Sequence, residues 1–163
     1  MAHASQHLLE FGGSPVGTEF DGSLSFQRVD RIPLLRVSQL FTPHTARQIR
    51  YCLVATVGAE RPFYHRYPYV ALDVRMVQGW EEGTPEFVRS LRERLRELGG
   101  ELALVVPPKP AANSAGEGTA LEPDRGPLAP EIPAFTHPED ALAYLKELRR
   151  ERRAAAIAAA LGR

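Results

Sequence analysis

The chain has 163 residues, of which 44% are apolar and 25% charged, and twenty basic side chains balance twenty acidic ones. This composition is typical of a globular protein and excludes a fully disordered chain. The balanced charge gives no overall field that would attract nucleic acid or an anionic membrane. The length predicts one domain of ordinary size with a single hydrophobic core.

The single cysteine, Cys52, cannot form a disulfide within the chain, which favours a reducing compartment. No apolar run approaches the ~18 residues of a membrane-spanning helix, and the N-terminus lacks the pattern of a signal peptide. We therefore expect a cytoplasmic protein without membrane insertion. Because Cys52 lies beside the apolar face of a predicted helix, we expect it to be a small buried thiol.

The first third of the chain predicts a tail, two strands and a helix. Residues 1–22 are polar and glycine-rich without a period, which is typical of a flexible tail. Two apolar runs follow, Ser23–Val29 and Pro33–Val37, and the polar break at Asp30–Arg31 indicates two neighbouring strands. Thr42 then predicts the cap of a helix whose first residue is proline and whose apolar residues recur at spacings of three and four.

The middle of the chain predicts a strand, a loop, a helix and a second strand. Tyr67–Val74 is a continuous apolar run ending in an acid, which indicates a strand buried on both faces. We expect a loop over Arg75–Gly83. Thr84 begins the next helix, which Gly99-Gly100 ends. Glu101–Val106 is a further buried strand.

The last third begins with an irregular segment. Nine of the 25 residues in 107–131 are proline or glycine, and a loop of this length in a compact domain is either functional or disordered. Ile132–Phe135 predicts a short last strand. Thr136 and Glu139 form a capping-box pattern at the start of a helix that runs to Leu161.

This order of elements predicts an α/β fold, with a single mostly parallel, mixed sheet of four to five strands covered by helices. The last helix would be about 35 Å long, more than a small sheet needs, so its end is expected to pack on a partner or on a second copy. Its basic cluster, Arg149–Arg153, is interpreted as a solvated face and not as a nucleic-acid site. The predicted units are a tail (1–22), a domain (23–148) with an irregular insertion (107–131), and a basic, alanine-rich helical extension (149–163).

Several segments, taken in order, resemble the STAS domain. They are LLRVSQLFTPHTARQIRYCL, YPYVALDV, EEGTPEFVRSLRERLRELGGELALVV and PAFTHPEDALAYL. The family includes bacterial anti-sigma factor antagonists, stressosome proteins and the cytoplasmic ends of sulfate transporters. The resemblance spans roughly Leu24 to Leu148 without the long loop. It implies a STAS-like fold and a regulatory function in signalling and transcription, exerted by binding a protein partner such as an anti-sigma factor of the kinase type or another STAS protein.

The resemblance also implies a switch, and the sequence departs from the family at that place. In phosphorylatable members, the loop after the third strand ends in Asp-Ser-Ser/Thr-Gly, and its first serine accepts the phosphate. Alignment on Gly83 places Glu81, which a Ser/Thr kinase cannot phosphorylate, at that position. The acids either favour the helix dipole as solvated charges or mimic a permanently charged state. Thr84 is interpreted as a helix cap and not as a phosphosite. The predicted partner-binding residues are Gly79, Trp80, Glu81, Glu82, Gly83 and Thr84.

Other candidate residues give weaker signals. Trp80 would be a binding anchor if it is exposed and a core residue if it is buried. Asp73 would end a buried strand at the carboxyl edge of the sheet, where α/β proteins place their sites, but a structural hydrogen-bonding role is the expected one. The five histidines, including His3 and His7, are interpreted as incidental, and we predict no metal site and no cofactor.

The sequence has no nucleophile elbow, P-loop or dinucleotide fingerprint, so we expect a protein that is not an enzyme. One alternative to partner binding is a carrier of a small ligand (a nucleotide, an anion or a lipid), with the long loop as a lid. Another is an enzyme on a flavodoxin-like sheet, for which no set of catalytic residues stands out. A pocket at the carboxyl edge would favour the carrier, and a shallow apolar surface around Trp80 and Thr84 would favour the partner-binding protein.

Overall fold

The computed structural model describes residues 23–55, 68–110 and 122–162, so the predicted tail, 1–22, lies outside the described residues. Their helices and strands are, in chain order, β1 Leu24–Val29, β2 Ile32–Phe41, α2 Pro43–Ala55, β3 Tyr69–Trp80, α4 Thr84–Glu97, β4 Glu101–Val105, β5 Ala134–Phe135 and α5 Pro138–Leu161. Each predicted strand and helix is present, although several bounds differ.

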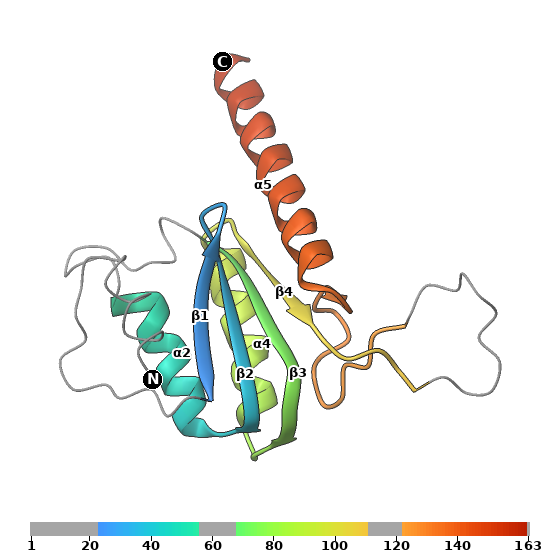
Figure 1. The fold of residues 1–163 in the computed structure, drawn as a ribbon. Helices are drawn as coiled ribbons and strands as arrows, with labels where there is room; N and C mark the ends of the chain where they lie inside the picture. The colour runs from blue at the N-terminus through green and yellow to red at the C-terminus, as the bar shows by residue number, and fades with distance from the viewer. Residues whose placement is uncertain (1–22, 56–67, 111–121, 163) are drawn as a thin grey trace.

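The strands form one sheet in the order β1-β2-β3-β4-β5 (Figure 1). β1 and β2 are antiparallel and meet in a tight turn in which Asp30 (φ 50°) and Arg31 (φ 67°) both have positive φ, as a two-residue type I′ hairpin requires. β2, β3, β4 and β5 run parallel to one another. The predicted single, mostly parallel, mixed sheet is therefore confirmed.

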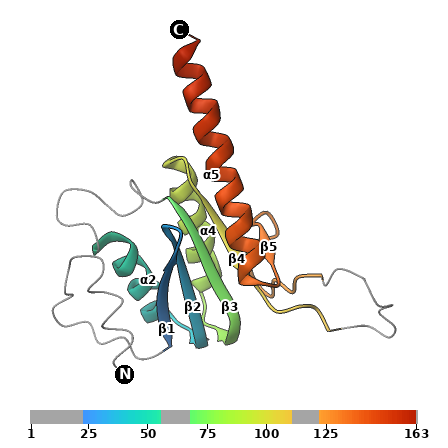
Figure 2. The same cartoon turned by 45° about the horizontal axis from the view of Figure 1, so that its top comes forward.

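Helices cover the two faces of the sheet unequally. α2 and α4 pack on one face and enclose the larger apolar cluster, in which Phe41, Ile49, Leu72 and Leu95 are fully buried. α5 packs on the other face, over β3, β4 and β5, through a smaller cluster that includes Leu145 (Figures 1 and 2). On the α5 side, no helix of the described residues covers the carboxyl-terminal halves of β2 and β3, and we call this part the uncovered face of the sheet. No helix within the described residues is long and apolar enough to cross a lipid bilayer.

The prediction of a loop over Arg75–Gly83 is wrong for most of its length. β3 continues to Trp80 alongside β2, which itself continues to Phe41, with shifts of register after Arg36 and Gln39. The part of β3 beyond Val74 is partly exposed and has few apolar residues. It therefore lacks the continuous apolar run that indicates a buried strand. A consequence is that Asp73 lies in the middle of β3 and not at its end.

The described part of the irregular segment contributes to the core. Residues 107–110 and 122–131 form no helix or strand, but an isolated bridge joins Pro108 to Pro123. Leu128 and Ala129 are buried in the larger apolar cluster, together with Ile132 just beyond the segment. The later part of the segment therefore belongs to the core, and residues 111–121 lie outside the described part of the chain.

Two predictions about α5 need correction. Its N-cap is His137, and no side chain caps the helix, so the capping box of Thr136 and Glu139 does not form. The basic cluster is not merely solvated either, because two of its arginines bind to turns that precede strands of the sheet. Arg149 donates a hydrogen bond to the carbonyl of Asp30, and Arg152 donates to the carbonyls of Gly99 and Gly100.

Candidate functional site

The ends of β2 and β3 bring two helix N-termini to one edge of the sheet. Phe41 and Trp80, the last residues of these parallel strands, are partners in the register, and each strand is followed almost at once by a helix. We call Phe41–Thr45 and Trp80–Thr84 together the carboxyl edge. Backbone N–H groups at helix N-termini carry partial positive charge, so an edge with two of them favours acidic groups.

Aromatic stacking and a backbone hydrogen bond hold the two halves of the carboxyl edge together. The Trp80 ring stacks on the Phe41 ring with centroids 4.8 Å apart and planes 16° apart, and Phe87 of α4 lies 6.4 Å from Phe41. The Glu81 N–H donates to the Phe41 carbonyl at 3.0 Å. Trp80 is half-buried against the larger apolar cluster, so it is neither a free anchor nor a core residue.

The predicted switch residues differ sharply in exposure. Glu81, Glu82 and Gly83 are exposed, whereas Thr84 is only 2% exposed. Gly83 is the N-cap of α4 at φ 81°, so the prediction of Thr84 as the cap is wrong. The Thr84 hydroxyl instead donates to the Glu81 carbonyl at 2.6 Å. It thereby fixes the turn that presents the two carboxylates, and it is not open to a kinase.

The other helix at this edge has the cap that the sequence predicts. The Thr45 N–H donates to the Thr42 hydroxyl and the Thr42 N–H donates to the Thr45 hydroxyl, both at 3.2 Å. This is the reciprocal arrangement of a capping box, with threonine in place of the usual glutamate. The start of α2 is therefore fixed beside the exposed acids that precede α4.

The last predicted site residue, Gly79, is half-buried within β3. A Cβ atom there would approach the Leu40 side chain to 2.9 Å, and Leu40 is 53% exposed and free to turn away. We therefore assign Gly79 no conformational role that only glycine could fill.

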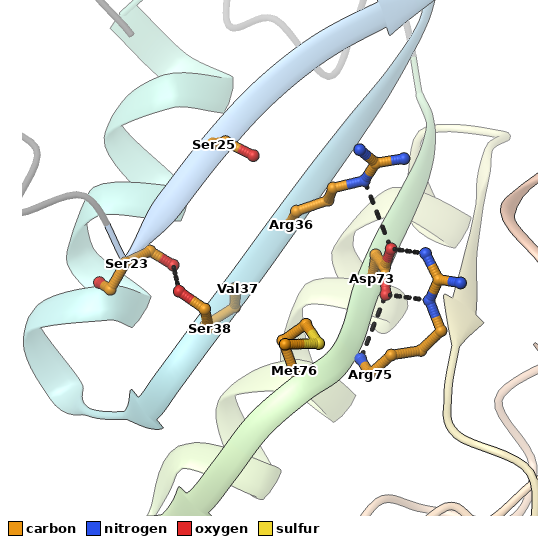
Figure 3. A pocket seen from close by; sticks show the side chains of 8 residues that line it. All are labelled: Ser23, Ser25, Arg36, Val37, Ser38, Asp73, Arg75 and Met76. Atoms are coloured by element: carbon orange, nitrogen blue, oxygen red, sulfur yellow. Dashed lines mark hydrogen bonds and ion pairs between the residues drawn. The ribbon is translucent and has the colours of Figure 1, made fainter. Parts of the chain in front are cut away.

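A second polar cluster, which the sequence revealed only in part, lies on the uncovered face of the sheet (Figure 3). Asp73 and Arg75 of β3 and Arg36 of β2 line a hollow of about 320 Å³ together with Ser23, Ser25, Val37, Ser38 and Met76. The Asp73 carboxylate is 5% exposed and binds the Arg75 guanidinium at 2.8 Å and 3.0 Å. The hydrogen bond to Asp73 raises the pKa of Arg75.

Sequence reasoning identified Asp73 but not its two arginines. Residues two apart on a strand share a face, so Asp73 and Arg75 could have been paired had the strand been extended past Val74. Arg36 lies opposite Asp73 in the parallel register, which only the tertiary structure sets. The expected structural role of Asp73 as a hydrogen-bond acceptor agrees with these contacts.

The remaining candidates offer no further chemistry within the described residues. Burial raises the pKa of the Cys52 thiol to about 12, so this cysteine is an inert core group, as the sequence predicts. The described part of the chain contains no group of three histidine, cysteine or acidic side chains that could hold a metal ion. His3 and His7 lie outside it.

The solved structures that match this chain include two anti-sigma factor antagonists. SpoIIAA, an anti-sigma factor antagonist in its unphosphorylated form, matches with a TM-score of 0.43 and 15% identity over 54% of this chain and 74% of its own. An anti-sigma factor antagonist from Mycobacterium paratuberculosis matches with a TM-score of 0.48 and 15% identity over 76% of this chain and 92% of its own. Both are anti-sigma factor antagonists, one of the classes that the sequence resemblance names, and at this identity the likeness concerns the fold alone. No protein-family model matches the sequence, and no curated protein matches it significantly.

Proposed function

We propose that this chain is a non-catalytic regulatory module that binds a protein partner at its carboxyl edge. The observation that carries the proposal is the fixed presentation of Glu81 and Glu82. Both carboxylates are exposed, while the backbone that bears them is held by the Phe41 carbonyl on one side and the Thr84 hydroxyl on the other. Such preorganisation lowers the entropic cost of binding.

The charge of this edge points to a partner with a basic surface. Glu81 and Glu82 directly precede α4, and the dipole at the N-terminus of that helix favours negative charge there. Half-buried Trp80 adds an apolar margin beside them. A basic side chain of the partner would give up its bound water and contact the two adjacent carboxylates. This charge complementarity favours specific and rapid association.

Regulation in this proposal does not pass through phosphorylation at the family position. Glu81 has no hydroxyl group, and the nearest hydroxyl in sequence, on Thr84, is buried and already donates to a backbone carbonyl. The edge would therefore carry a constant negative charge, and partner binding would be controlled by the abundance of the two proteins.

Charge reversal tests the proposal. The variant Glu81→Lys/Glu82→Lys is compared with Glu93→Lys, which alters an exposed residue further along the same helix. Each tagged protein is used to capture partners from an extract of the cells that produce it, after thermal melts verify that all are folded. We expect a protein that the wild type and Glu93→Lys retain and the double variant loses. If all three proteins retain the same partners, the carboxyl edge is not the interface.

We further propose that the end of α5 is a second contact surface, used for pairing with another copy of the chain. This end projects beyond the sheet (Figures 1 and 2), and Ile157 and Leu161, one turn apart, are 52% and 82% exposed. Ile157→Glu/Leu161→Glu should abolish concentration-dependent self-association measured by light scattering, and Ala155→Glu should preserve it. A wild-type protein that stays monomeric up to millimolar concentration would refute this pairing.

A further inference from the structure

The hollow on the uncovered face of the sheet is separate from the carboxyl edge. Arg36 and Asp73 lie in the middle of their strands, several residues before the strand ends that form the edge. Figure 3 shows α2 and α4 behind the strands, while the charged side chains of the hollow stand on the opposite side. The hollow and the carboxyl edge can therefore be tested independently of each other.

The carboxylate in the hollow has all the hydrogen-bond donors that it can use. Asp73 Oδ1 accepts from the Arg75 backbone N–H at 3.1 Å and from Arg75 Nε at 3.0 Å. Asp73 Oδ2 accepts from Arg75 Nη2 at 2.8 Å and lies 3.4 Å from Arg36 Nε. An ionised carboxylate offers about four lone-pair sites, and these three hydrogen bonds and the ion pair with Arg36 surround it.

The two arginines retain donors that Asp73 does not engage. Only Nε of Arg36 faces the carboxylate, and its two terminal nitrogens point away from Asp73 (Figure 3). Two positive charges against one negative charge leave this cluster with an excess of one positive charge. Glu139 at the start of α5 also acts on Arg75, but it does not line the hollow. The excess is therefore concentrated at Arg36, on the side of β1.

The rest of the lining complements this charge. Ser25 and Ser38 supply hydroxyl groups, and Met76, which is 69% exposed, supplies an apolar surface. No acid other than Asp73 lines the hollow. Its volume of about 320 Å³ is at the lower end of the range for small-molecule sites.

We propose that this hollow binds the oxyanion group of a small organic molecule, a phosphate or a carboxylate. The terminal N–H groups of Arg36 bind the oxyanion in the forked geometry that arginine offers. The Ser25 hydroxyl completes its shell, and Met76 contacts the carbon skeleton. The Ser38 hydroxyl donates instead to the Ser23 carbonyl, at 3.4 Å. Asp73 does not contact the ligand, and its negative charge offsets part of the positive charge that the arginines present.

Titration followed by amide NMR spectra tests the site. Inorganic phosphate and succinate are added separately to the full chain, with sodium chloride at matched ionic strength as the blank. We expect saturable shifts confined to the amides of residue 25 and of residues 36–38 and 73–76, with a Kd on the order of 1 mM. The anion with the lower Kd distinguishes a phosphorylated ligand from a carboxylate. Shifts that fail to saturate, or that sodium chloride reproduces, overturn the proposal.

Two variants with opposite expected effects sharpen this test. Arg36→Gln should abolish the saturable shifts. Arg47→Gln makes the same charge change at an exposed position of α2 and should leave the Kd unchanged. Asp73→Asn removes a negative charge beside the site and should tighten binding about fivefold. If Asp73→Asn weakens binding, or if Arg36→Gln binds as the wild type does, the arginines serve only the ion pair with Asp73.

Discussion

An ion pair between Arg92 of α4 and Glu101 of β4 joins the helix to the sheet, and substituting its members tests how much it stabilises the fold. Arg92 Nε and Nη2 donate to the two Glu101 oxygens at 2.7 Å and 3.2 Å, and Glu101 Oε1 also accepts from the Leu102 N–H at 3.0 Å. The Arg92 and Glu101 side chains are 13% and 5% exposed. Tyr144 of α5 lies close by, and its pKa is raised by burial and then by the charge of Glu101.

Arg92→Met keeps most of the apolar length of the side chain but leaves Glu101 with one backbone donor. Removing one partner of a buried pair costs about 3–5 kcal/mol, and the residual exposure of Arg92 places the expectation near 3 kcal/mol. The double variant Arg92→Met/Glu101→Gln buries no unpaired charge and should lose only about 1 kcal/mol. The second substitution is therefore expected to recover about 2 kcal/mol of the stability that Arg92→Met loses.

Urea unfolding followed by circular dichroism measures these values. With a slope of about 2 kcal/mol/M, Arg92→Met should lower the midpoint by roughly 1.5 M. The control is Arg94→Met, whose partner Glu97 is 64% exposed, and its free energy of unfolding should change by less than about 0.5 kcal/mol. If Arg92→Met behaves like Arg94→Met, water already screens the pair and the argument from burial is wrong.

Two further predictions concern Cys52 and the turn before β4. Burial raises the pKa of Cys52 from 9.0 to about 12. At pH 8 the thiolate is therefore about 1000-fold scarcer in the folded protein than in the unfolded chain. The native protein should resist a thiol reagent that labels the protein at once in urea. Because the raised pKa favours the folded state only while the thiol is protonated, the free energy of unfolding should fall as the pH rises from 9 to 12. Rapid labelling of the native protein at pH 8 would contradict the burial of Cys52. A Cβ at Gly100 would lie 1.7 Å from the Pro68 carbonyl oxygen, so Gly100→Ala should cost about 3 kcal/mol in thermal melts. Gly99→Ala, at φ 85° with open space around it, should cost only about 1 kcal/mol, and equal losses would show that the close approach to Pro68 relaxes easily.

The sequence determined the elements that local patterns control. The apolar run before Asp73 placed the buried part of β3, the Thr42-Pro43 pair placed the start of α2, and the spacing of leucines placed α4. These signals arise from burial on one or both faces and from backbone groups near a helix end, which depend on neighbours in the chain. The parallel sheet followed from the alternation of strands and helices.

The tertiary structure decided what depends on distant residues. β3 extends to Trp80 because β2 pairs with it there, and Trp80 is half-buried because the Phe41 ring lies against it. Gly83 takes the cap position that the sequence assigned to Thr84, since only the folded turn shows which residue has positive φ. Arg36 meets Asp73 through a register that no local pattern encodes. Composition and periodicity therefore gave the layers of this protein, while the pairing of strands decided which polar side chains share a site.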